Sequence, residues 1–151
     1  MQDLYHNILP VRALRPQTIS TGVSPDVLVS GAIDLLGYFA AQIVVDFGDI
    51  DELGASPVGS ARIDVRLEHA DDDGTGAPDV FSNVALDDVI GPTSVTTGIV
   101  ASVTTDATLV RVGYRGERRF LRVSLVPTAL PNGGPVAAWV ELGHPRHAPA
   151  S

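Results

Sequence analysis

The segment Arg62–His69 alternates apolar and charged side chains. Ile63, Val65 and Leu67 are each separated by one charged residue. A period of two places these three side chains on one face of a strand, whereas a helix would scatter them around its axis. The pattern therefore excludes an amphipathic helix and predicts a strand with one buried face. The rest of the chain has to supply partners for such a strand.

Seven further segments are strand-like, because they are short, rich in β-branched residues and bounded by turn-forming residues. Residues 86–89 are either a helical turn or a strand end. In the segment 38–48, the side chains expected on the buried face are Phe39, Ala41, Ile43, Val45 and Phe47. The predicted strands span 27–36, 38–48, 80–84, 94–103 and 136–142, with two more inside 109–126.

Eight strands without a convincing helix predict an all-β fold. A single antiparallel β-sandwich or barrel is expected, with jelly-roll topology as the most natural arrangement. Hydrophobic residues make up 44% of the 151 residues and aromatic residues only 5%, so the core has to come from Val, Ile, Leu and Ala. We expect an extended N-terminal arm over residues 1–25, a sandwich domain over 26–143 and a flexible C-terminal tail over 144–151.

The expected arm combines prolines with apolar side chains. Pro10, Pro16 and Pro25 interrupt any long helix or central strand. The apolar content is too high for a solvated tail, so the arm has to lie on a surface, either of its own domain or of a partner. The residues of the arm that are candidates for partner binding are Leu4, Tyr5, Ile8 and Leu9.

The stretch 109–126 concentrates the basic residues of the chain. It carries five of the ten Lys and Arg residues on a chain of net charge −8. We interpret it as a β-hairpin whose turn contains Gly116, a residue that is free to adopt positive φ. Its basic side chains either pair with carboxylates of neighbouring strands or contact an acidic protein partner, because guanidinium groups bind carboxylates bidentately. They are Arg111, Arg115, Arg118, Arg119 and Arg122.

Composition excludes or disfavours several classes of function. The chain has no cysteine, which excludes disulfides and thiolate metal sites. Its acidic balance argues against direct nucleic-acid binding. The opening residues are not those of a signal peptide, and no apolar run reaches the ~18–20 residues of a membrane helix. We therefore expect a soluble protein that is used without export and has no membrane partner.

The sequence carries no catalytic or cofactor motif. Asp71–Asp73 lack the ligand spacing and flanking helices of an EF-hand, so a solvated hairpin turn is expected, with adventitious or structural Ca²⁺ as the alternative. His144 and His147 lack a third ligand, and His69 is expected to be a strand-end polar residue on an inward face. No nucleophile motif is present. We expect no enzyme activity, no cofactor and no metal site.

The sequence contains three blocks, MQDLYHNIL (1–9), RVGYRGERRFLRV (111–123) and LGHPRHAPA (142–150), and a fourth segment, VRLEHADDDG (65–74). The three blocks, and more loosely the fourth segment, resemble a family of small proteins from tailed phages and prophages. These proteins are encoded in the head-gene cluster near the major capsid protein. The resemblance implies a capsid decoration (cement) protein, a structural virion protein that binds the outer surface of a tailed-phage head and stabilises it. A head–tail junction component is the nearest alternative.

The same resemblance implies partners and a location. The partners would be the major capsid protein and further copies of the chain, with a trimer favoured. The location would be the capsid surface of the virion, after synthesis in the host cytoplasm. A carbohydrate- or host-surface-binding module is a further alternative, because residues 114–123 loosely resemble the last strands of discoidin-like domains. The low aromatic content argues against it, since sugar sites usually present exposed aromatic rings.

Overall fold

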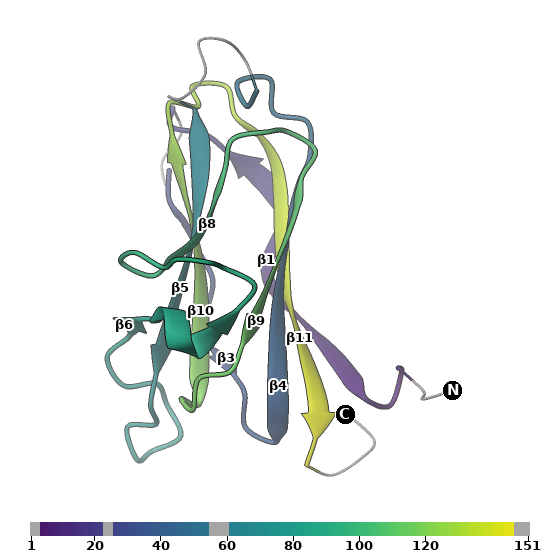
Figure 1. Ribbon diagram of the computed structural model, residues 1–151, viewed down its shortest axis with the longest axis vertical. Helices are drawn as coiled ribbons and strands as arrows, with labels where there is room; N and C mark the ends of the chain where they lie inside the picture. The colour runs from purple at the N-terminus through teal and green to yellow at the C-terminus, as the bar shows by residue number, and fades with distance from the viewer. Residues whose placement is uncertain (1–3, 23–25, 55–60, 147–151) are drawn as a thin grey trace.

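A computed structural model describes residues 4–22, 26–54 and 61–146. In this part of the chain eleven strands form two antiparallel sheets that pack face to face (Figure 1). Sheet A contains, in spatial order, β1 (Ile8–Ile19), β11 (Gly134–Pro145), β4 (Tyr38–Phe47), β9 (Leu109–Tyr114) and β7 (Val89–Ile90). Sheet B contains β2 (Leu28–Val29), β3 (Ile33–Asp34), β10 (Phe120–Thr128), β5 (Arg62–Ala70), β6 (Ser82–Asn83) and β8 (Ile99–Val103).

The expected all-β sandwich is confirmed, and its strand order is that of a jelly roll. β2 and β3 both pair with β10, and β6 and β8 both pair with β5, so each pair counts as one interrupted strand. The sheets then read β1-β11-β4-β9 and β2/β3-β10-β5-β6/β8, with β7 as a short addition at the edge of sheet A. Apart from the step from β5 to β6/β8, successive strands lie in opposite sheets.

The core fills the space between the sheets. Ile63, Val65 and Leu67 of β5 are fully buried, as their alternation predicts. Leu121 and Leu125 of β10 are also fully buried beside them. Each such side chain contributes about 1.5–3 kcal/mol by leaving water. Because the chain has few aromatic residues, the sandwich depends on many aliphatic contacts of this size.

Some predicted strands are shorter than expected. The segment 27–36 is divided into β2 and β3, because the side chain of Ser30 replaces part of the backbone ladder. Its Oγ accepts a hydrogen bond from the backbone N–H of Val123 at 3.0 Å and donates one to the carbonyl of Gly31 at 2.8 Å. The segment 94–103 is a strand only over β8, since Thr97 and Gly98 have positive φ. Residues 86–88 form a 3₁₀ turn that leads into β7.

The predicted hairpin at 109–126 is wrong. β9 pairs with β4 and β7 in sheet A, whereas β10 pairs with β2, β3 and β5 in sheet B. The connection between them is therefore an arch that crosses the sandwich. Gly116 within it does not have positive φ; a Cβ there would collide with the ring of Tyr114, so close packing explains the glycine.

The predicted N-terminal arm is largely a strand of the sandwich. β1 pairs with β11 from Ile8↔Gly143 to Ile19↔Gly134, with two register irregularities, and Ile19 is 1% exposed. Pro10 and Pro16 are accommodated because β1 is an edge strand, whose outer side needs no N–H donor. The boundary expected after residue 25 thus does not separate an arm from the domain, and residues 8–19 lie on their own domain.

The C-terminal boundary also differs from the prediction. β11 continues to Pro145, so His144 and Pro145 of the expected tail belong to the last strand. Because β1 and β11 are antiparallel neighbours, the start of β1 and the end of β11 lie at the same end of the sandwich (Figure 1). The rest of the expected tail after Arg146 lies outside the described residues, as do residues 1–3 and 23–25 of the expected arm.

Candidate partner-binding surface

An open groove of about 830 Å³ crosses the outer face of sheet A. It lies where β1 begins and β11 ends. Leu4 and Ile8 line it from the N-terminal side, Ile90 from β7 and Arg111 from β9. We call it the sheet A groove. Leu4 is 70% exposed and Ile90 57% exposed, so the groove places large apolar side chains in water.

The sheet A groove carries charges of both signs, because Glu141 lines it together with Arg111. The carboxylate of Glu141 is held by two neutral donors. Glu141 accepts hydrogen bonds from Gln42 Nε2 at 2.9 Å and, more weakly, from Trp139 Nε1 at 3.3 Å. Arg111 forms no ion pair within the described residues and is exposed. Arg111 therefore offers a partner a cation that forms no ion pair within the described residues, beside a carboxylate that is already hydrogen-bonded.

Arg119 of the arch and Arg122 of β10 bind carboxylates of sheet B instead. Arg119 binds Asp34 bidentately, at 2.9 Å from Nε and 2.7 Å from Nη2, and also contacts Asp72. The hydrogen bond from Arg119 holds the pKa of Asp34 below its usual value, and the same bond raises the pKa of Arg119. Arg122 binds Glu68 at 2.9 and 3.0 Å and lies 4.2 Å from the ring centre of Phe81.

The remaining two arginines of the stretch have weaker partners. Arg115 donates from Nε to the backbone carbonyl of Asp87 at 2.7 Å. Arg118 donates to Ser82 Oγ at 2.9 Å and lies 3.8 Å from a carboxylate oxygen of Asp71. The five arginines are thus divided between the two sheets and do not form one basic patch.

Three of the nine predicted partner-binding residues meet in the sheet A groove: Leu4, Ile8 and Arg111. Tyr5, which is 84% exposed, follows Leu4 in the sequence, while Leu9 packs against the core. Sequence reasoning missed Ile90, Gln42 and Glu141. The outward position of Gln42 was visible in the alternation of its strand, but nothing local shows which strands lie beside it. The other predicted arginines, Arg115, Arg118, Arg119 and Arg122, lie outside the groove lining.

A buried polar pair links the two sheets near the arch. His69 Nδ1 of β5 lies 3.0 Å from the hydroxyl oxygen of Tyr114 of β9. Burial lowers the pKa of His69, with a further lowering by Arg118 and opposing effects of Asp88 and Asp71. Burial also raises the pKa of Tyr114 to about 12. Both groups are therefore neutral near pH 7, and the pair is a structural hydrogen bond between sheets.

Within residues 4–22, 26–54 and 61–146, no group of three or more His, Cys, Asp or Glu side chains is placed to hold a metal ion. No helix in the same ranges is long and apolar enough to cross a membrane.

Comparison with known proteins adds a weak likeness. No protein-family model matches the chain, and no curated protein matches it. The chain is 12% identical to a chain of a solved structure. That structure is described by the words "Bacillus endospore appendages form a novel family of disulfide-linked pili". The match covers 91% of this chain and 88% of that chain, with a TM-score of 0.41. At this level the likeness carries no argument about function, so the sandwich and its groove have to be interpreted from their own chemistry.

Proposed function

We propose that this protein is a structural virion protein that decorates the outer surface of a tailed-phage head. The observation that carries the proposal is the meeting of Leu4 and Ile8 with Arg111, which lies far from them in sequence, in the sheet A groove. Two of these residues belong to the N-terminal block and one to the arginine-rich block that resemble phage head-cluster proteins. The groove is the surface through which the major capsid protein would be bound.

The chemistry of the groove supports a protein partner. Leu4 and Ile90 are large, exposed apolar side chains, and their burial favours association. Arg111 adds a charge that is not paired within the described residues and that suits a carboxylate on the partner. Arginine and apolar side chains in one concave surface are typical of protein interfaces.

The benefit to the head would come from linkage. A protein that binds assembled capsid subunits and not dissociated ones stabilises the assembled state by mass action. A rigid two-layer sandwich suits this task because its binding face does not need to be ordered on contact. The copies would act as a symmetric oligomer, with a trimer favoured, on the capsid surface of the virion. A head–tail junction component is the alternative position for the same contact.

The test is co-sedimentation with empty heads assembled from a tailed-phage major capsid protein encoded in the same genome as this chain. Wild-type protein should sediment with the heads, and electron microscopy should show it over the whole surface. Density confined to one vertex would move the proposal to the head–tail junction. A failure to sediment with the heads at every salt concentration would overturn both positions.

A matched pair of variants locates the contact. Arg111→Glu should weaken head binding by about tenfold or more, because one reversed charge at an interface costs about 1.4 kcal/mol or more. Arg115→Glu makes the same charge change at another exposed arginine outside the groove and should bind like wild type. Equal losses for both variants would show that binding depends on overall charge and not on the groove.

A further inference from the structure

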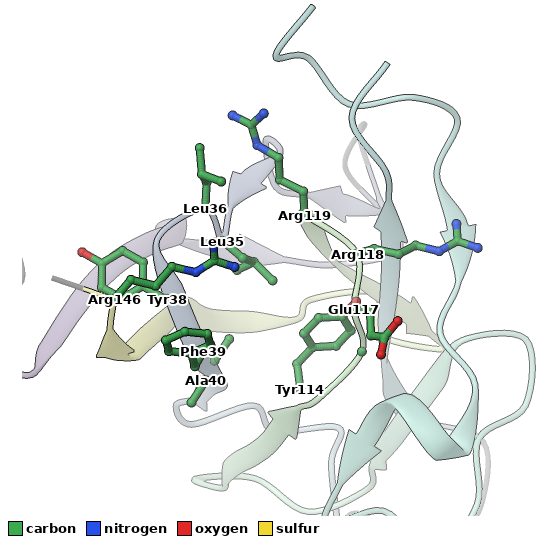
Figure 2. Close-up of a pocket in the computed structure, with 12 residues that line it drawn as sticks. Leu35, Leu36, Tyr38, Phe39, Ala40, Tyr114, Glu117, Arg118, Arg119 and Arg146 are labelled. Atoms are coloured by element: carbon green, nitrogen blue, oxygen red, sulfur yellow. The ribbon is translucent and has the colours of Figure 1, made fainter. Parts of the chain in front are cut away.

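A second cavity, of about 350 Å³, opens at one end of the sandwich. It lies between the residues that lead from β3 into β4 and the arch from β9 to β10 (Figure 2). Leu35, Phe39 and Tyr114 form its apolar lining, and Arg146 lies at its edge. We call it the sandwich mouth. It is separate from the sheet A groove, although both use the first residues of β4.

The sandwich mouth exists because β4 extends past the core that faces it. Phe39 continues the inward series of Ala41, Ile43 and Val45, and alternation predicts that it is buried. It is 70% exposed instead, while Ala41 is 7% exposed. Leu36, which also lines the sandwich mouth, is 59% exposed. The fold thus directs an apolar surface into a cavity that no side chain of the described chain fills.

Arg146 places a positive charge over this apolar surface. Its guanidinium carbon lies 5.0 Å from the ring centre of Phe39, and its backbone N–H donates to the carbonyl of Gly37 at 2.7 Å. No carboxylate within the described ranges forms an ion pair with it. Figure 2 shows the guanidinium of Arg146 between Leu35 and Phe39.

The other charged groups of the lining are directed elsewhere. Arg119 is neutralised by Asp34, and Arg118 donates to Ser82. In Figure 2 the ends of both side chains point away from Arg146, and the carboxylate of Glu117 lies on the far side of Tyr114. Arg146 therefore decides the charge that the sandwich mouth prefers.

We propose that the sandwich mouth binds a small organic acid that has an apolar ring or chain and one carboxylate. The apolar part would bury against Phe39, Leu35 and Tyr114, and the carboxylate would bind the planar guanidinium of Arg146 bidentately. The cavity volume lies within the range of small-molecule sites. This site is independent of the proposed function. It shares only residues at the start of β4 with the sheet A groove, and it does not use Arg111.

The experiment compares three probes of one shape on the full-length protein: 3-phenylpropionate, 3-phenylpropanol and 3-phenylpropylamine. Binding is followed by titration of the backbone amide signals in ¹H–¹⁵N NMR spectra. The acid should bind about fivefold more tightly than the alcohol, as expected for one exposed charge pair, and the amine should bind most weakly. The shifted signals should come from residues 35–41 and 114–119.

Matched variants separate the two parts of the site. Arg146→Gln should remove the preference for the acid over the alcohol, whereas Arg111→Gln, which makes the same change in the sheet A groove, should retain it. Phe39→Ala should weaken binding of all three probes, and thermal unfolding would verify that it is folded. Equal binding of acid and alcohol by wild type, a preserved preference in Arg146→Gln, or shifts confined to the sheet A groove would each overturn the proposal. No capsid is used, so its failure is distinct from failure of head binding.

Discussion

Arg111 and Arg122 come from one basic stretch, yet the fold uses them differently. Arg122 stands directly opposite Glu68 in sheet B and binds it with two nitrogens. Arg111 stands opposite Val44 in sheet A, where no acidic side chain lies across the ladder. The difference comes from strand pairing, since β9 and β10 belong to different sheets. A cluster of arginines in a sequence therefore becomes a binding surface only where its neighbours leave the charge unpaired.

Charge reversal should give the largest separation between these two arginines. Arg122→Glu removes two charge-assisted hydrogen bonds and places a second carboxylate opposite Glu68, so the free energy of unfolding should fall by about 2 kcal/mol. Arg111→Glu should change it by less than about 0.5 kcal/mol. Urea denaturation measures both. Similar losses would mean that Arg111 also supports the fold.

A double-mutant cycle sharpens the same comparison with a smaller effect. The coupling free energy between Arg122 and Glu68, from single and double alanine variants, should be about 1 kcal/mol. The matched cycle between Arg111 and Glu141, which line the same groove without forming an ion pair, should give a coupling close to zero. A coupling in the second cycle as large as in the first would contradict the distinction.

The His69–Tyr114 pair, which joins the two sheets that hold these arginines, should make stability sensitive to mild acid. Burial lowers the pKa of His69 in the folded protein. Below the ordinary value of 6.5 the unfolded chain takes up a proton before the folded one, so stability falls as pH decreases toward the folded pKa. His69→Gln should flatten the dependence of Tm on pH between about 7.5 and about 5. An unchanged slope in the variant would assign the effect to other groups.

The Asp34–Arg119 pair should give the smallest effect, because it is more exposed than the His69–Tyr114 pair. The hydrogen bond from Arg119 lowers the pKa of Asp34, so its contribution is present above the ordinary value of 3.8 and is lost as pH falls through the folded pKa. Arg119→Gln should have a lower Tm than wild type at pH 7, and the two should converge in stronger acid. A constant difference at all pH values would show that the pair does not titrate.

Sequence periodicity predicted where the strands lie in the chain better than it predicted which strands pair with one another. The strand at 62–69 was visible because its apolar residues have an uninterrupted period of two, and the structure buries Ile63, Val65 and Leu67. The hairpin at 109–126 was wrong because a tight connection does not show whether the next strand returns to the same sheet. In the jelly-roll order that the same sequence predicted, this connection has to cross the sandwich.

The candidate surfaces were harder to predict because they depend on registers between distant strands. The sheet A groove combines residues of β4, β7, β9 and β11 with Leu4 and Ile8, and no local pattern reports that these meet. Phe39 shows the opposite error, since its alternation is correct but the facing layer ends before it. Periodicity predicts which way a side chain points and not whether anything covers it.

The edge strand β1 has a consequence for behaviour at high local concentration. Prolines at positions 10 and 16 and two register irregularities interrupt its outer side, and β7, at the other edge of sheet A, has only two residues. Such edges are poor templates for another strand, so neighbouring copies resist merging into a continuous cross-β ribbon. Crowded copies would therefore remain separate molecules that touch through their faces and ends. A surface densely covered by them would be protected from fibril growth.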